Sequence, residues 1–283
     1  MIKARRKIDT NLFKNINTHI HSNILNNIYA IDGSKIRVHA GFKRYGFKSR
    51  TNDKPVPRQA KRPLAMLSSL YGVESQTTLN YTITSHFNER RCVPELINVL
   101  NKDDIVIMDR GYYSAELFEH FYRTNIHAVF RLKKDANKTV KKFYSSSRIS
   151  LFSYLIRDGK VIPIRYVKYT INGIKYIIGT TITNMSYRVI KQLYKLRWGV
   201  ETSYKRIKSY HNLNTVYART HRLWQQEIQL RILYDTLLTN IQIKTQVKKR
   251  KLLRKMAYGI INLRTFAFIL DIPLQFTTNF DYG

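Results

Sequence analysis

A short apolar run at residues 104–108, with the sequence Asp-Ile-Val-Ile-Met, constrains the fold of this chain more than any other stretch. Its consecutive apolar residues show no alternation, which is typical of a strand buried on both faces of a sheet. A strand of this kind needs other elements packed over both faces. We therefore expect a sheet with helices packed against it.

The residues before this run predict further strands. Residues 27–31 form another apolar run, followed by the turn sequence Asp-Gly-Ser and by alternating residues 35–39, so we expect a strand, a tight turn and a second strand. Two more strand candidates, residues 64–71 and 77–84, come after a basic loop. Successive strands of this kind predict an antiparallel meander.

The residues after the run predict helices and one more buried strand. Pro94 suits the first turn of a helix, where its missing N–H is not needed. Ser114 is placed to cap a second helix that continues to about Tyr122. Residues 127–132 resemble a further buried strand. This order of strands and helices fits a mixed sheet with helices on it.

Residues 133–183 interrupt that order. Their second half holds two strand-like runs, 162–170 and 174–181, separated by Asn172-Gly173. Asn-Gly between two such runs is the strongest short signal for a β-hairpin. We interpret residues 133–183 as a β-rich insertion.

Two long helices are predicted after the insertion, one from near Ser186 and one at about 221–244. The whole pattern predicts an α/β fold, a mixed sheet flanked by helices, with the β-rich insertion before the helix that carries Glu201. The predicted organisation is a short basic N-terminal segment, a core in two parts, the insertion and a basic C-terminal segment, at residues 1–24, 25–132 with 184–245, 133–183 and 246–283.

The charge of the chain points to a polyanionic partner. Fifty Lys and Arg against 18 Asp and Glu give a net charge of +32, which makes nucleic acid the leading candidate. We find no apolar run of about 18 residues and no secretion leader, so no membrane partner is expected. The single cysteine, Cys92, excludes an internal disulfide and Cys-based zinc sites. We expect a cytoplasmic, nucleoid-associated protein.

Three acidic residues are candidates for catalysis. Asp32 and Asp109 each follow an apolar strand, and neighbouring strands, about 4.8 Å apart, would bring them together. Glu201, on the later helix, would complete a cluster for two Mg²⁺ ions, with Mn²⁺ able to replace them. The alternative is that each Asp simply marks a turn or corner. Asp104 and Glu227 are rival carboxylates that we interpret as ordinary.

A polar stripe runs along the helix that carries Glu201. On a helical wheel Tyr194, Arg197, Glu201 and Lys208 fall within roughly 60°. Trp198 and Lys205 flank this stripe, and a separate apolar face is expected to pack on the core: Val189, Leu193, Leu196, Val200 and Ile207. Cations and aromatic rings around one carboxylate suit a phosphodiester that carries a metal ion. The alternative is a solvated face with an ordinary Glu201–Lys205 ion pair.

These motifs resemble those of the DDE transposases of bacterial insertion sequences, in the group with the Tyr-x2-Arg-x3-Glu-x6-Lys signature. Tyr194, Arg197, Glu201 and Lys208 match that spacing without a gap. The contexts Ile-Asp-Gly-Ser-Lys and Met-Asp-Arg-Gly-Tyr, which contain Asp32 and Asp109, resemble those of the two catalytic aspartates. The resemblance covers about residues 25–240.

The resemblance implies a ribonuclease H-like core in which Asp32, Asp109 and Glu201 are catalytic and hold the metal. It also implies that Tyr194, Arg197 and Lys208 contact phosphates of the transposon end. The implied reaction is metal-dependent cleavage at transposon ends, followed by attack of the 3′-hydroxyl on target DNA, without a covalent protein–DNA intermediate. The implied partner is double-stranded DNA, bound by a homodimer.

One departure from the family leaves an alternative open. Family members usually carry a helical end-binding domain before the first catalytic Asp, and 31 residues precede Asp32 here. A truncated or repurposed transposase would act only as a non-specific DNA-binding protein, through phosphate contacts. A basic RNA-binding protein is a third hypothesis, although we recognise no RNA-binding module.

Overall fold

Eight strands form one sheet in the computed structural model, which describes residues 9, 11–12, 14–17, 27–48, 63–214, 218 and 220–245. In spatial order the strands are β3 (Thr77–Thr84), β2 (Leu64–Gly72), β1 (Ile28–Arg37), β4 (Ile105–Met108), β5 (His127–Arg131), β8 (Ile174–Thr180), β7 (Lys160–Ile171) and β6 (Ser150–Arg157). The predicted segment 246–283 and most of segment 1–24 lie outside the described residues.

The sheet is mixed, as predicted. β2 is antiparallel to both β1 and β3, which confirms the meander. β1, β4 and β5 run parallel, and β5, β8, β7 and β6 are antiparallel in turn. β4 is central and buried along its whole length, as its uninterrupted apolar sequence predicts.

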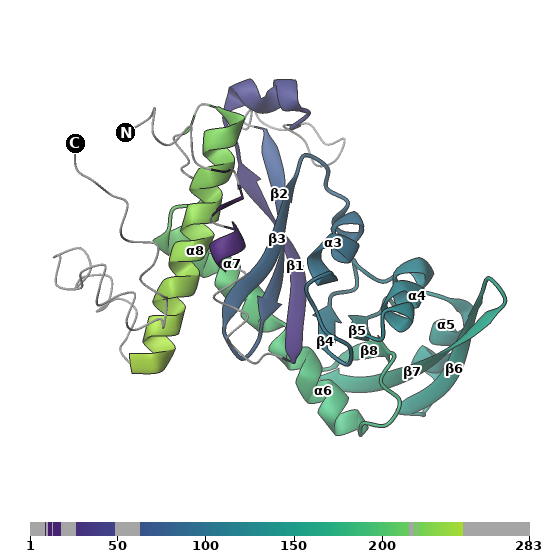
Figure 1. The fold of residues 1–283 in the computed structure, drawn as a ribbon. Coiled ribbons are helices and arrows are strands. Elements are labelled where there is room, and N and C mark those ends of the chain that lie inside the picture. The colour runs from purple at the N-terminus through teal and green to yellow at the C-terminus, as the bar shows by residue number, and fades with distance from the viewer. Residues whose placement is uncertain are drawn as a thin grey trace, which may run out of the picture.

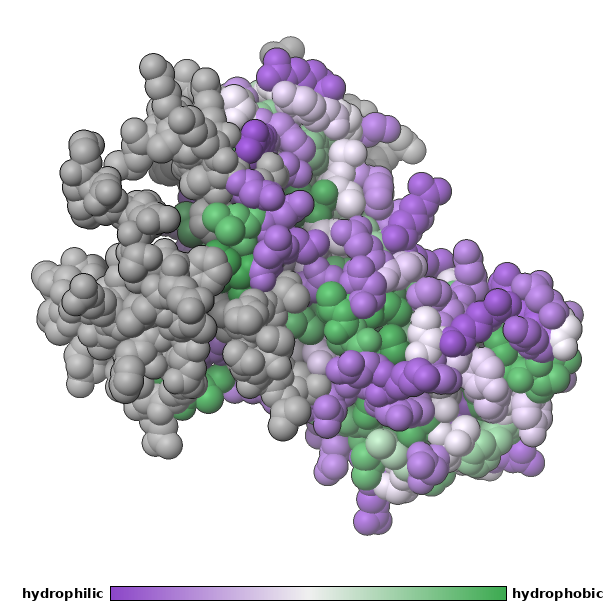
Figure 2. Space-filling model, viewed as in Figure 1, coloured by the Kyte–Doolittle hydropathy of each residue, from purple (hydrophilic) through white to green (hydrophobic). Residues whose placement is uncertain are grey.

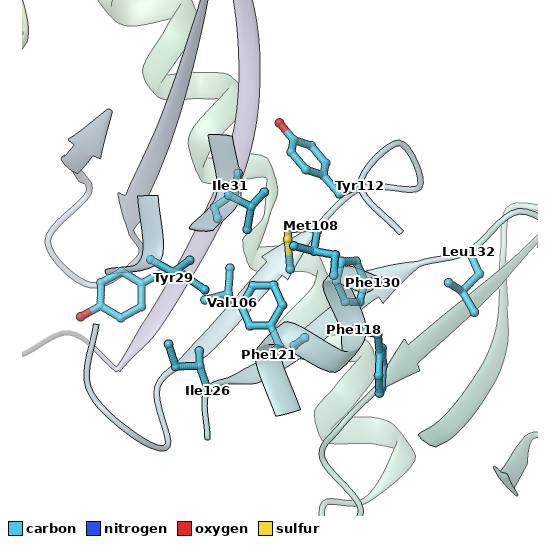
Figure 3. Packing of buried hydrophobic residues seen from close by; sticks show 14 of the residues in the cluster. Tyr29, Ile31, Val106, Met108, Tyr112, Phe118, Phe121, Ile126, Phe130 and Leu132 are labelled. Carbon is cyan, nitrogen blue, oxygen red and sulfur yellow. The ribbon is translucent and has the colours of Figure 1, made fainter. Parts of the chain in front are cut away.

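Helices cover both faces of the sheet (Figure 1). Apolar residues of α6 (Tyr187–Leu196), α7 (Trp198–Tyr210) and α8 (His221–Thr245) pack on one face, where Ala30 and Ile107 point. Those of α3 (Val93–Ile97), α4 (Ala115–Arg123) and α5 (Lys138–Ser145) pack on the other face, against Ile31 and Met108 (Figure 3). Two short 3-10 helices, η1 (Ala40–Tyr45) and η2 (Glu89–Cys92), complete the described elements. No helix in the described part of the chain is long and apolar enough to cross a membrane.

The predicted turn at Asp32-Gly33-Ser34 is wrong, because these residues lie inside the continuous strand β1. Each of the three is paired with a residue of β2, and Asp32 lies opposite Ser69. A ladder along the full strand outweighs the local preference of Asp-Gly for turns. β4, in contrast, pairs only with residues 28–31, so its ladder with β1 stops just before Asp32.

The predicted hairpin at Asn172-Gly173 is confirmed. β7 and β8 are joined by these two residues, whose φ angles of 48° and 75° are both positive, as a two-residue hairpin loop of the favoured type requires. β8 also pairs with β5, so the β-rich segment continues the core sheet. Its far end exposes Phe152, Tyr154 and Ile156, and Figure 2 shows hydrophobic patches among hydrophilic residues on the described surface.

The predicted helix starts at Ser114 and Ser186 are confirmed, since each side chain accepts a hydrogen bond three residues on. The predicted single helix through Lys208 is wrong, because α6 ends at Leu196 and α7 begins at Trp198. α7 approaches the sheet closely at Gly199. A Cβ atom built there would lie 2.7 Å from a ring carbon of Tyr71 on β2.

We predict that Gly199→Ala destabilises the fold. The added methyl group has no room against Tyr71, and overpacking of this kind costs about 1–3 kcal/mol of unfolding free energy. Gly111→Ala is the matched control, because nothing lies within 4 Å of its built Cβ. Urea unfolding of both variants measures the difference, and equal stabilities would contradict the close contact.

Candidate active site

The parallel pairing of β1 and β4 brings two acidic residues side by side. Ile31 is paired with Met108, so Asp32 and Asp109 are the next residues on adjacent strands. Their side chains are 21% and 33% exposed, so both reach solvent at the sheet edge. The prediction that their strands are neighbours is confirmed.

Glu201 is linked to Asp32 through the side chain of Arg197. Arg197 Nη2 donates to Glu201 Oε1 at 2.6 Å, and Arg197 Nη1 lies 3.8 Å from Asp32 Oδ2. The Arg197 side chain is only 6% exposed. Glu201 therefore makes its ion pair with Arg197 and not, among the described residues, with Lys205.

Asp109 and the backbone of Asp32 are held by two tyrosines. The Tyr194 hydroxyl donates to Asp109 Oδ1 at 3.1 Å, and Arg131 Nη1 lies 3.8 Å from the same oxygen. The Tyr204 hydroxyl donates to the Asp32 carbonyl oxygen at 2.7 Å. Helices α6 and α7 are thus tied to the two strands at the point where the acidic residues lie.

The predicted direction of the polar stripe is wrong in part. Tyr194 and Arg197 do not point away from the core but are buried against the sheet edge, at 4% and 5% exposure. Val189 and Leu196, predicted to pack on the core, are each 39% exposed. The reason is that α6 and α7 pack on the sheet beside the middle of β1 and the end of β4, so Tyr194 and Arg197 face the aspartates.

The other three predicted DNA-binding residues lie on α7, outside this buried network. Lys208 Nζ donates to Ser34 Oγ at 2.6 Å and to the Lys35 carbonyl oxygen at 2.9 Å. Trp198 is 60% exposed and lies beside the Arg197 guanidinium. Lys205 is exposed.

Burial raises the pKa of Asp32 to about 6. The Gly33 N–H, which donates to Asp32 Oδ1 at 2.9 Å, and the charge of Arg197 lower the pKa, and other carboxylates raise it. Burial is the largest of these effects, because a carboxylate in a dry place is costly to ionise. A cation close to Asp32 would lower this cost.

Asp32, Asp109 and Glu201 offer carboxylate oxygens that suit a hard divalent cation. Their side chains do not surround a single point in this structure. Among the described residues, no three His, Cys, Asp or Glu side chains are grouped closely enough to hold a metal ion. The guanidinium between Asp32 and Glu201 explains this, since a positive group already lies where a cation would bind. Carboxylate oxygens are the ligands that Mg²⁺ prefers.

Sequence reasoning missed Glu89, whose carboxylate lies against Gly33. Glu89 follows β3 in a polar stretch and carries no recognisable motif. The scarcity of acidic residues in this chain was the one available signal, and it does not separate Glu89 from the others.

Asp32→Asn is predicted to stabilise the metal-free protein at neutral pH. Because the pKa of Asp32 is higher in the folded chain than in the unfolded chain, this group favours folding below about pH 4, and the contribution is lost as pH rises through about 6. Asn does not titrate. Urea unfolding in EDTA should show the stability of Asp32→Asn, relative to wild type, rising by about 2 kcal/mol between pH 4 and pH 7.5. A pH-independent difference would contradict the raised pKa.

Comparison with known proteins identifies the family of this chain. A family model described as the transposase DDE domain matches residues 25–234. No curated protein matches the sequence. Among solved structures, that of the piggyBac transposase in a synaptic complex with hairpin DNA is similar, with a TM-score of 0.52 and 13% identity. The match covers 90% of this chain and 55% of that one, so this chain spans about half of that transposase and shares its ribonuclease H-like fold. Because the family model covers most of the chain, the protein belongs to the transposase DDE domain family.

Proposed function

We propose that the chain is a DNA transposase that cuts DNA strands at transposon ends and joins the freed 3′-hydroxyl to target DNA, with divalent metal ions. The observation that carries this proposal is the placement of Asp32 beside Asp109, with Glu201 linked to Asp32 through Arg197. Asp32 and Asp109 are adjacent through strand register, and Glu201 shares a guanidinium with Asp32. Mixed sheets commonly place their active sites where strands end.

Asp32, Asp109 and Glu201 would hold two Mg²⁺ ions, which Mn²⁺ can replace. Such a metal pair activates the attacking oxygen and stabilises the leaving oxygen of a phosphodiester. The protein supplies the ligands and their orientation. Tyr194 keeps Asp109 in place through its hydroxyl, and Tyr204 fixes the backbone of Asp32.

Arg197 has a separate role in this proposal. Its guanidinium offsets the charges of Asp32 and Glu201, and its Nε is buried without a hydrogen-bond partner in the described part of the chain. A divalent cation held by Asp32 and Glu201 would leave the Arg197 guanidinium free to bind a phosphate oxygen of the transposon end. Arginine suits both partners, because its planar fork matches carboxylate and phosphate.

The partner is double-stranded DNA, at the transposon ends and at the target. A net charge of +32 favours association with a polyanion, and Trp198 and Lys205 are exposed on α7 beside the site. Lys208 extends this surface. We propose that a homodimer pairs two ends on DNA, in the nucleoid region of the cytoplasm.

A DNA-binding protein without cleavage is the alternative function. The positive charge favours it equally, because phosphate contacts alone give sequence-independent binding. The acidic residues at the sheet edge disfavour it. A protein that only coats a polyanion gains nothing from placing carboxylates against its partner.

Asp109→Asn is predicted to abolish strand cleavage while leaving DNA binding intact. The substitution removes one charge and keeps the side-chain shape, so the metal ligand is lost without a packing change. We expect Mg²⁺-dependent nicking of a duplex with transposon ends to fall by roughly a thousandfold or more. Asp158→Asn, at an exposed hairpin turn, is the control. Equal nicking by wild type and Asp109→Asn would exclude this site.

Lys205→Ala is predicted to remove one phosphate contact. The plot of log affinity against log salt should become less steep by about 0.9 for duplex DNA. Lys102→Ala removes the same charge from an exposed residue that precedes β4, at the end of that strand opposite Asp109. This variant should leave the slope unchanged. Fluorescence anisotropy of a labelled duplex at several salt concentrations measures both. A change of similar size in the control would show that only net charge matters.

A further inference from the structure

β6 forms the outer edge of the sheet, at the end farthest from β3 (Figure 1). It pairs with β7 from Ser150 to Arg157 without a bulge, and its sequence there contains neither proline nor lysine. Among the described residues, no backbone hydrogen bond reaches its other side. Proline, lysine and bulges are the devices that usually protect an edge strand, so β6 is left able to pair.

The opposite edge strand, β3, is protected within the chain. Residues 77–82 of β3 are buried. The Asn17 side-chain amide donates to the carbonyl oxygens of Thr78 and Leu79, at 2.8 and 3.2 Å. The chain thus covers one edge of its sheet and, in its described part, leaves the other edge open.

Every second residue of β6 combines an exposed apolar side chain with outward-directed backbone groups. The Lys168 N–H donates to the Ile149 carbonyl oxygen at 2.8 Å, so Ile149 and every second residue after it bond to β7. Phe152, Tyr154 and Ile156 therefore direct their N–H and C=O groups outward. Their side chains are exposed, at 60%, 69% and 73%. The same three residues thus offer both hydrogen bonds and apolar surface to a partner.

The face of the sheet to which these side chains belong is almost free of charge. Val161 and Pro163 of β7 continue it beside them, and Val161 is 56% exposed. Arg165 is the one charged residue of β6 and β7 on this face, and it is only 9% exposed. Its guanidinium donates to carbonyl oxygens of the loop before α6. DNA binding depends on cations, so this face suits an apolar partner better than DNA.

A second copy of the chain matches this surface. Two β6 strands that run antiparallel around a two-fold axis offer each other the same outward N–H and C=O groups, so one arrangement satisfies both edges. Residues that pair across the axis lie on the same face, which brings the aromatic and aliphatic side chains of the two copies into cross-strand contact. The uncharged face also lets two chains of net charge +32 meet there without opposed cations.

The available surface is large enough for a specific contact. Phe152, Tyr154, Ile156 and Val161 expose on the order of 400 Å² of apolar side chain in each copy. Together with the backbone edge of an eight-residue strand, this approaches the roughly 500 Å² per partner that a specific interface requires.

We infer that β6 is an interface between two copies of this chain, which pair antiparallel along their outer edges in the absence of DNA. The eight-stranded sheet of one copy then continues into that of the other. The inference goes beyond the proposed function, because it needs neither a metal ion nor DNA, and it assigns a surface to the proposed homodimer.

Sedimentation equilibrium of the full chain, freed of nucleic acid and kept in about 0.5 M NaCl, tests the interface, because bridging by DNA is lost at high salt. Wild type should dimerise. Tyr154→Glu places opposed charges at the contact and should raise the dimer Kd roughly tenfold or more. Tyr122→Glu, at a 41% exposed tyrosine on α4, is the matched control and should leave the Kd unchanged.

A disulfide gives a second, geometric test. Cys92 is the only cysteine and is buried, so Tyr154→Cys adds a single accessible thiol. Antiparallel pairing brings this part of the two strands within the about 4.4–6.8 Å between Cα atoms that a disulfide spans. Mild oxidation should therefore give covalent dimers, from Tyr154→Cys alone or from its mixture with Phe152→Cys. Tyr122→Cys should remain largely monomeric under the same oxidation.

A monomeric wild type would overturn the inference, and a lower Tm for Tyr154→Glu would then place β6 under a segment of its own chain. A dimer that Tyr154→Glu does not weaken, or one that forms only with DNA, would overturn it as well. Asp109→Asn should dimerise like wild type. Failure of the interface and failure of the proposed cleavage are therefore separate outcomes.

Discussion

One guanidinium group holds the candidate site together. Arg197 contacts Glu201 and Asp32, so a single buried cation joins helix α7 to strand β1. Acidic side chains lie together here although the net charge of the chain is +32. Burial makes the Asp32 carboxyl group costly to ionise. Three features keep the Arg197 guanidinium in place relative to the aspartates. They are the hydrogen bonds of Tyr194 and Tyr204, the close contact at Gly199 and the register of β1 and β4.

Much of the fold could be predicted because its signals are local. The uninterrupted apolar run of β4 predicted a doubly covered strand, Ser114 and Ser186 predicted helix starts, and Asn172-Gly173 predicted a hairpin. Each signal depends on neighbouring residues alone: a capping hydroxyl, a positive φ, a run without polar interruption. The proximity of Asp32 and Asp109 also followed from local patterns, since it requires only that two such strands pair.

The errors arose where partners distant in sequence decide the structure. Asp-Gly favours a turn, but pairing with β2 keeps Asp32 inside a strand. A helical wheel assigns a polar stripe to solvent, but Tyr194 and Arg197 are buried because α6 and α7 pack on the sheet and turn these residues toward Asp109 and Asp32. Glu89 could not be found at all, since its only distinction is contact with Gly33, more than fifty residues away in sequence.

The continuity of the sheet has a structural consequence. Arg131, at the end of β5, is paired with Ile178 of β8, and its guanidinium lies 3.8 Å from Asp109. The β6–β7 end and the surroundings of Asp109 therefore belong to one hydrogen-bonded sheet, joined through β8 and β5. The guanidinium beside the second aspartate has its position set by the same strand pairing that attaches the β-rich segment to the core.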